Sequence, residues 1–333
     1  MRRLEQAGRK RDRDQDDQGR AQADEWHPIA TWVGTFPFPP FGDRPPKTLE
    51  PVRESAVSNE DDGTRARHAR EGDKAYPRAS VRDQKDADGD VRADTLALTQ
   101  LARAVQIRLT LGGTNTISPA LKFLGISFCN TNVTPTALPP NRAAWGKILP
   151  VVERSQQSYP GGGGWCSPTS LSMALAHWGT TQHREDWNLD APEVAAGVSD
   201  HGFKFLTGNW TFNTAFAGTL PGMRAYVTRF SDISELEEWI TAGIPVIISA
   251  RYDLLQDGRP DDLSGHLTVC RGFTENGDLI INDPWTDIKV ESIRHIYKRA
   301  NVSRAWATSH NTVYLVYPSG TKIPKDKFGH WAR

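Results

Sequence analysis

Cysteine and methionine are scarce in this 333-residue sequence, with three of each, and the 40 Lys and Arg residues balance 40 Asp and Glu residues. The cysteines, Cys129, Cys166 and Cys270, are odd in number and far apart, which argues against a disulfide framework and against a Cys-x-x-Cys zinc site. No window offers about eighteen consecutive apolar residues, so no membrane span is expected. Because no long block of charge has one sign, we predict neither a nucleic-acid partner nor a membrane-surface partner.

Signals for export and for bound groups are also missing. Arg2 and Arg3 are followed by no apolar segment, so the sequence shows no signal peptide and leaves the localisation open. The aspartates of residues 86–90 have the spacing of a calcium loop, but Val91 stands where that loop needs glycine. The glycine run 161–164 is not followed by the Gly-Lys-Ser/Thr of a phosphate loop. We therefore predict no metal ion and no organic cofactor.

The composition changes along the chain, whose length is about that of two domains. Residues 1–72 are rich in charge and proline and poor in large apolar side chains, so we expect them to be disordered or of low order. Residues 73–130 contain short runs typical of strands, at 79–81, 91–96, 105–111 and 121–128, and predict a small β-rich accessory domain. Four prolines within residues 131–150 indicate a linker.

Residues 151–333 predict an α+β domain. Ser167 as N-cap, Pro168 at the first helical position and Gly179 as the stop mark one helix, and residues 233–242 mark another. Strands are expected at residues 245–251, 266–273, 279–282 and 312–317. A helix followed by a run of antiparallel strands is typical of the α+β class.

Cys166 stands immediately before the predicted N-cap of the first helix. Unpaired amides and the positive end of the helix dipole favour the thiolate at such a position, which makes Cys166 a candidate nucleophile. A buried, inert cysteine is the alternative. Gly164, the last residue of the glycine run, allows close backbone approach, and Trp165 can form a wall of a cleft. Both are therefore candidate substrate-binding residues.

A cysteine nucleophile needs a base, and the base needs a residue that orients it. His266 begins one strand of a predicted hairpin. With a two-residue turn at 274–275 the partner of His266 is Asp283, whereas a turn at 276–277 makes the partner Asp287. Hairpin geometry alone leaves both aspartates open.

Other polar residues compete for roles in the same site. His177 follows Cys166 by eleven residues in the predicted helix, roughly 16 Å along its axis, which is too far for proton transfer. The backbone N–H of Cys166 is a natural donor to an oxyanion, and Gln156 or Gln157 could add a side-chain amide.

The segments around these residues resemble the double-glycine (bacteriocin-processing) peptidase-like family, a family of papain-fold cysteine peptidases, and in particular its stand-alone, soluble bacterial members. The nucleophile region of that family is similar to the stretch Ser155 to Pro160, the four glycines, and Trp165 to Ser170. The resemblance covers about residues 150–318, and the further segments that agree are Gly208–Ala215, Ala225–Arg229, Gly243–Val246, Gly265–Leu267, Arg271–Phe273 and Asn282–Pro284.

The resemblance implies a papain-like domain in which Cys166 is the nucleophile, His266 the base and Asp283, rather than Asp287, the orienting residue. It also implies that Gln156 stands at the oxyanion position. Activity without a cofactor, on a peptide or protein substrate, follows from the same resemblance.

Three further expectations accompany it. The β-rich region that precedes the peptidase in such proteins is β-sandwich-like, and the copy here looks partial. Relatives are commonly exported, which suggests an extracellular location. Asn209 and Trp210 either line the substrate cleft, together with Gly265, or form a packing corner.

We therefore expect a cysteine peptidase that hydrolyses peptide or isopeptide bonds through a Cys-His-Asp triad. One alternative is a peptidoglycan amidase or endopeptidase with the same Cys-His chemistry, which would contact cell-wall material through the β-rich region. The other is a non-catalytic binding or scaffold protein that retains the fold.

Overall fold

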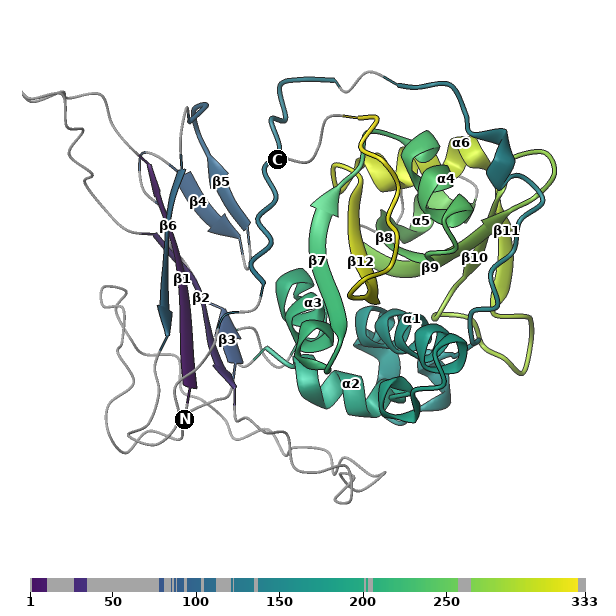
Figure 1. The fold of residues 1–333 in the computed structure, drawn as a ribbon, viewed down its shortest axis with the longest axis horizontal. Helices are drawn as coiled ribbons and strands as arrows, with labels where there is room; N and C mark the ends of the chain where they lie inside the picture. The colour runs from purple at the N-terminus through teal and green to yellow at the C-terminus, as the bar shows by residue number, and fades with distance from the viewer. Residues whose placement is uncertain are drawn as a thin grey trace, which may run out of the picture. The chain divides into compact units, whose positions relative to one another are not determined.

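The computed structural model describes residues 2–10, 27–34, 78–80, 85, 87, 89–92, 95–102, 105–111, 121, 123–134, 137–200, 202, 206–256 and 265–328. The chain divides into two compact units, which we describe separately (Figure 1). The first comprises residues 1–119 with 201–203, and the second comprises residues 120–200 with 204–333.

The first unit contains two antiparallel sheets. A four-stranded sheet has the order β3-β2-β1-β6, and β4 pairs with β5 in a separate hairpin. The strands are β1 (Arg2–Lys10), β2 (His27–Gly34), β3 (Arg78–Ser80), β4 (Gly89–Arg92), β5 (Thr95–Leu98) and β6 (Val105–Leu111). The predicted strand at residues 105–111 is thus present as β6.

The predicted strand at residues 79–81 overlaps β3, whereas two other predicted strands differ from the structure. β1 and β2 fall within residues 1–72, for which composition predicts disorder or low order. Residues 91–96 are not one strand: β4 ends at Arg92 and β5 begins at Thr95, and these two residues pair with each other. Residues 121 and 123–128 form no strand.

The second unit is built on one six-stranded antiparallel sheet with the order β11-β10-β9-β8-β12-β7 (Figure 1). Its strands are β7 (Met223–Arg229), β8 (Val246–Arg251), β9 (Gly265–Phe273), β10 (Leu279–Asn282), β11 (Arg294–Tyr297) and β12 (Thr312–Pro318). Almost every residue of β8, β9 and β12 is buried, without the alternation of a sheet that has one face in water. Both faces of the sheet are therefore covered.

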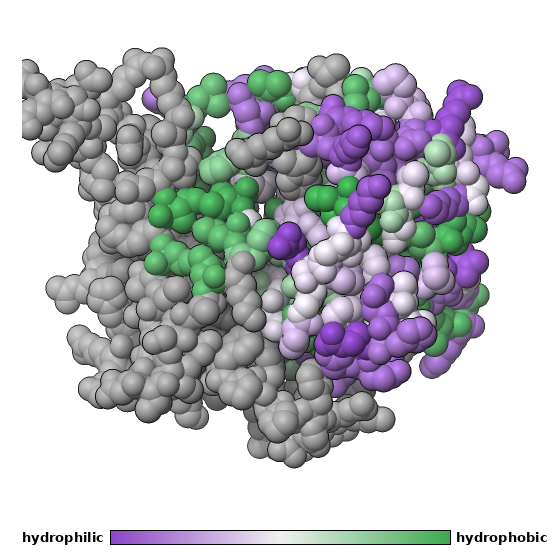
Figure 2. Space-filling model, viewed as in Figure 1, coloured by the Kyte–Doolittle hydropathy of each residue, from purple (hydrophilic) through white to green (hydrophobic). Residues whose placement is uncertain are grey.

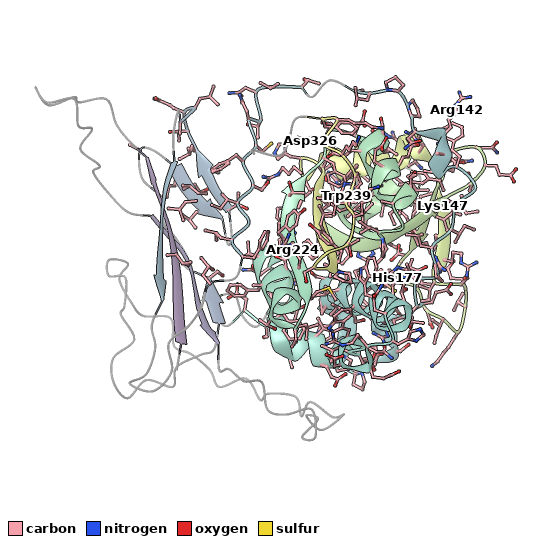
Figure 3. All side chains as sticks on the ribbon, viewed as in Figure 1. Arg142, Lys147, His177, Arg224, Trp239 and Asp326 are labelled. Atoms are coloured by element: carbon pink, nitrogen blue, oxygen red, sulfur yellow. The ribbon has the colours of Figure 1, made fainter. Side chains whose placement is uncertain are left out.

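Helices provide this cover, with α1 to α3 on one face and α4 to α6 on the other (Figure 1). They are α1 (Cys166–Thr181), α2 (Ala191–Val198), α3 (Trp210–Thr219), α4 (Ile233–Thr241), α5 (Tyr252–Gln256) and α6 (Arg299–Ala307). Trp239, labelled in Figure 3, is fully buried among them, as are Leu171, Phe273 and Trp306. The mixed helices and antiparallel strands confirm the predicted α+β class.

Hydrophilic residues predominate over the second unit on the face that Figure 2 shows. Across the described ranges, no helix has both the length and the apolar character needed to cross a membrane.

The proline-rich segment before the second unit's first helix packs against α4. The N–H of Asn141 donates to Glu237 Oε2 at 2.7 Å, and Trp145 Nε1 donates to Glu237 Oε1 at 2.8 Å. Lys147, labelled in Figure 3, donates through Nζ to the carbonyl of Thr241 at 2.7 Å. This segment directly precedes residues 151–157, which lie beside the candidate site.

Candidate active site

Cys166 is the first residue of α1. The helix begins two residues earlier than predicted, with Trp165 at the N-cap position, and it continues past Gly179 to Thr181. Ser167 is not the cap, because its hydroxyl is bonded to the Tyr314 hydroxyl at 2.9 Å inside the core. The amides of a first helical turn have no partner within the helix, so the partly exposed Cys166 lies at the electropositive end of α1.

A buried hydrogen bond holds α1 against β9. Ser170, one helical turn after Cys166, donates its hydroxyl hydrogen to the carbonyl of Leu267 at 2.8 Å. Leu267 directly follows His266 in β9. The bond therefore sets the distance between the two chain segments that carry Cys166 and His266.

His266 and Asp283 form a buried pair. His266 Nε2 lies 2.7 Å from Asp283 Oδ1, and the two residues are 5% and 1% exposed. Asp283 also accepts hydrogen bonds from the hydroxyl of Tyr297 at 2.7 Å and from the N–H of Trp285 at 3.0 Å. Because Nε2 is engaged by Asp283, Nδ1 is the ring nitrogen left to interact with Cys166.

The electrostatics of these three residues favour a thiolate beside an imidazolium. Burial opposes ionisation of Cys166, but the hydrogen bond from His266 and its positive charge prevail, and the pKa of the thiol is lowered. Burial likewise disfavours the charged form of His266, yet the negative charge of Asp283 raises the pKa of this imidazole to about 10. The pKa of Asp283 is lowered despite its burial, chiefly by the charge of His266.

The hairpin that carries the pair has neither of the two predicted registers. Leu279 pairs with Phe273, but Ile281 pairs with Cys270, so β9 has one extra residue in a bulge at Arg271. Asp283 follows the last residue of β10 and reaches His266 through its side chain. The structure therefore brings Asp283 to His266.

Asp287 is not part of this arrangement. It lies in the loop before β11, where its side chain accepts the N–H of Lys289 at 3.0 Å. Of the two aspartates that hairpin geometry left open, only Asp283 lies beside the imidazole.

Gln156 is 1% exposed, and its side-chain amide is engaged by the glycine loop. Nε2 donates to the carbonyls of Gly162 and Gly163 at 2.9 and 3.1 Å. As the side chain stands, Gln156 orders this loop, and a role at the oxyanion requires it to exchange one of these bonds. The exposed Gln157 donates its amide to the carbonyl of Trp285.

The predicted substrate-binding residues lie in the loops around Cys166 and in the turn that begins α3. Asn209 is the N-cap of α3, where its side chain accepts the N–H of Phe212 at 3.0 Å, and Trp210 is partly exposed. Thr207, in the same turn, donates to the carbonyl of Gly164 at 2.9 Å. The start of α3 thus lies beside the loop that leads into Cys166.

Glycines with unfilled space surround the site. A Cβ added at Gly163, Gly164, Gly208 or Gly265 would meet no atom within 4 Å, and none of these glycines has a positive φ. Neither packing nor backbone conformation explains glycine at these positions. Trp165, between Gly164 and Cys166, is partly exposed and packs near the ring of Tyr159.

Sequence reasoning missed several residues that support the site. Tyr297 bonds Asp283 from a four-residue strand, β11, whose short apolar pattern is a weak signal. Tyr252 packs edge-on against His266 with ring centroids 5.0 Å apart. Ser170 lies in the predicted helix, but its partner in β9 is known only from the fold. In the described part of the chain, no group of three or more His, Cys, Asp or Glu side chains could hold a metal ion.

Comparison with known proteins links both parts of the chain to one kind of peptidase. The model of the Peptidase_C39 like family matches residues 148–314, and that of the Peptidase C39 N-terminal domain matches residues 61–129. No curated protein matches the chain. A solved structure from Bacillus anthracis, described as that of a candidate C39-like peptidase, is 18% identical and covers 54% of this chain and 99% of its own, with a TM-score of 0.39.

Proposed function

The chain belongs to the peptidase C39-like family, and from this premise we propose that it is a papain-like cysteine peptidase that hydrolyses peptide or isopeptide bonds through Cys166, His266 and Asp283. The observation that supports the proposal is the buried hydrogen bond between His266 Nε2 and the Asp283 carboxylate, together with the electrostatic effect of His266 that lowers the pKa of the Cys166 thiol. This is the order of nucleophile, base and orienting acid that thiol acyl transfer requires.

In the proposed reaction, the Cys166 thiolate attacks the carbonyl carbon of the substrate. The tetrahedral oxyanion accepts a hydrogen bond from the backbone N–H of Cys166, which has no partner within α1. The His266 imidazolium then protonates the departing amine, and the acyl group remains on the sulfur. His266 next removes a proton from water, the hydroxide attacks the thioester, and release of the carboxylic acid regenerates the initial pair.

Asp283 has a separate task in this scheme. Its buried carboxylate bonds Nε2–H, so it directs Nδ1 toward the sulfur and stabilises the positive charge that His266 carries before amine departure. The raised pKa of His266 keeps this proton available across the neutral range.

The glycines around the site support a peptide substrate. Among the residues that the structure describes, no atom lies within 4 Å of a Cβ added at Gly163, Gly164, Gly208 or Gly265, so an extended backbone can approach the main chain closely on either side of Cys166. We propose that this space, with Gln156 and Asn209 shaping its loops and with Trp165 and Trp210 at its margin, receives the residues that flank the scissile bond.

The test is hydrolysis of a peptide library, followed by mass spectrometry, with wild type and Cys166→Ala. The matched control is Cys129→Ser, which removes an exposed thiol outside the site. We expect wild type and Cys129→Ser to cleave and Cys166→Ala to lose all measurable activity while its circular dichroism is unchanged. Turnover by Cys166→Ala would reject the nucleophile, and cleavage of purified cell walls without cleavage of peptides would indicate a peptidoglycan hydrolase.

A further inference from the structure

Tyr297 is a buried residue of β11, at the edge of the six-stranded sheet, that touches neither Cys166 nor any residue of the glycine loop in the bonds described above. Its hydroxyl donates to Asp283 Oδ2 at 2.7 Å, and 7% of the residue is exposed. Resting on the proposed function, we propose that Tyr297 is a positioning residue, which fixes the carboxylate of Asp283 and through it the imidazole of His266.

The geometry distributes three donors over the two oxygens of one carboxylate. Oδ1 accepts from His266 Nε2 and from the N–H of Trp285, whereas the bond to Oδ2 comes from Tyr297. The donors come from β9, from the loop after β10 and from β11. Without the bond to Oδ2, the carboxylate is free to rotate about its terminal torsion, which is intrinsically soft.

The tyrosine ring is itself held in place. Leu279 of β10 pairs with Tyr297 in the sheet, and His295 stacks on its ring with centroids 5.6 Å apart and planes at 10°. His295 Nε2 in turn lies 2.8 Å from the hydroxyl of Thr286. The phenol therefore cannot turn away from Asp283 without disturbing β11 and the loop before it.

Tyr297 remains a hydrogen-bond donor throughout the working range of pH. Burial and the negative charge of Asp283 raise the pKa of its phenol far above the ordinary value. The other titratable groups around the Asp283–Tyr297 pair are His266, Tyr252 and Glu291, with His295 on the outer face of the ring. Among these groups, His266 is the one whose pKa is raised by the charge of Asp283.

Loss of the phenol hydroxyl should shift the acid and alkaline sides of the pH–rate profile of Cys166 in opposite directions. Asp283 loses a donor that stabilises its ionised form, so its pKa rises and the acid limb of reactivity moves to higher pH. His266 faces a less firmly fixed carboxylate, so its raised pKa falls and the alkaline limb moves to lower pH. The pH range over which Cys166 is reactive therefore narrows at both ends. A smaller fraction of folded protein alone would lower the rate without narrowing this range.

The experiment measures the rate at which iodoacetate alkylates Cys166 between pH 4 and pH 10.5. Because the imidazolium attracts this anionic reagent, the rate falls at low pH when the thiolate is lost and at high pH when His266 loses its proton. All proteins carry Cys129→Ser, so that the exposed thiol does not react, and Cys270 is fully buried. Tyr297→Phe is compared with Tyr317→Phe, the control, which removes a buried hydroxyl from β12 of the same sheet where it bonds Tyr226 at 3.1 Å. We expect both limbs to move inward by about half a pH unit or more in Tyr297→Phe and neither to move in Tyr317→Phe.

A second variant keeps the test decisive if Tyr297→Phe does not fold. Site-specific 3-fluorotyrosine at position 297 keeps the shape of the ring, and its more acidic hydroxyl donates a stronger hydrogen bond, so the acid limb should move to lower pH. Unmoved limbs in a folded Tyr297→Phe, or in the fluorotyrosine protein, would overturn the proposal.

Alkylation needs no substrate, so this test is independent of the peptidase proposal. Shifted limbs in a protein that cleaves nothing would support the positioning role while rejecting hydrolysis. Where hydrolysis is observed, kcat/KM of Tyr297→Phe at pH 7 should be about tenfold below that of Tyr317→Phe. Equal values for the two variants would count against the role of Tyr297.

Discussion

Two buried histidines lie near α1 and have opposite electrostatic character. His177, labelled in Figure 3, is 3% exposed and lies in the same helix as Cys166, with Nδ1 3.2 Å from the carbonyl of Pro150. Burial lowers its pKa. His266 is 5% exposed, and the charge of Asp283 raises its pKa to about 10.

The comparison separates the effect of burial from the effect of a partner. Both imidazoles are removed from water, which by itself favours the neutral form. A backbone carbonyl leaves that preference in place for His177, whereas a buried carboxylate reverses it for His266. We infer that the charge of Asp283, more than the position of His266 near the sulfur, makes His266 a proton donor to a leaving amine.

The largest expected effect comes from removing that carboxylate. Asp283→Ala should lower kcat/KM by about 10³-fold, because His266 loses both its orientation and the charge that keeps it protonated. Asp283→Asn retains a hydrogen-bond acceptor without the charge and should fall between wild type and Asp283→Ala. In both variants the alkaline limb of the pH profile should move down from near pH 10 toward the ordinary histidine range, which steady-state kinetics would detect. An unmoved alkaline limb in Asp283→Ala would show that another group sets the pKa of His266.

A smaller loss is expected when the spacing between α1 and β9 is disturbed. Ser170→Ala removes the bond to the carbonyl of Leu267 and should slow peptide hydrolysis and alkylation of Cys166 by about tenfold. Ser172→Ala is the matched control, since that hydroxyl is equally buried but bonds Thr169 within α1 at 2.8 Å. If the two variants were equally reactive, the Ser170 bond would have no part in placing the thiolate.

The smallest effect on activity should come from His177→Gln, with kcat/KM within about twofold of wild type, because this imidazole is neutral and distant from the reacting atoms. We expect His177→Gln to change the stability of the folded protein instead. Because the folded-state pKa of His177 lies below the unfolded value of about 6.5, its contribution is fully present above that value and is lost as the pH falls below it.

Thermal unfolding between pH 5 and pH 7.5 would check this sign. The melting temperature of wild type should fall toward acid pH, and that of His177→Gln should fall less steeply. If His177→Gln lost as much activity as Asp283→Ala, the two histidines would not differ in function as we propose.

Local patterns revealed the positions of the two principal residues. Helix-start signals indicate Cys166 and a strand pattern indicates His266, and both kinds of signal depend on neighbours in sequence. The cap itself was wrong, because Tyr314, far along the chain, provides the partner of Ser167. The choice of Asp283 came from family resemblance, since hairpin geometry had left it tied with Asp287.

The rest depended on contacts between distant segments. Tyr297 lies in a four-residue edge strand, and nothing near it in sequence indicates that its hydroxyl meets Asp283. By contrast, the sequence at the start of α2 contains a local signal: Asp190 and Glu193 form a capping box around Pro192, a pattern that marks a helix start.

The bulge at Arg271 bears on how this hairpin can vary. The Arg271 guanidinium bonds the carbonyl of Leu149, the carboxylate of Glu153 and the side chain of Asn282, so it clamps the strand pair just before Asp283. Strand alignment on the catalytic side of that clamp does not rely on the turn at residues 274–277. We therefore expect insertions or deletions at the hairpin tip of this chain to leave the imidazole of His266 and the carboxylate of Asp283 aligned.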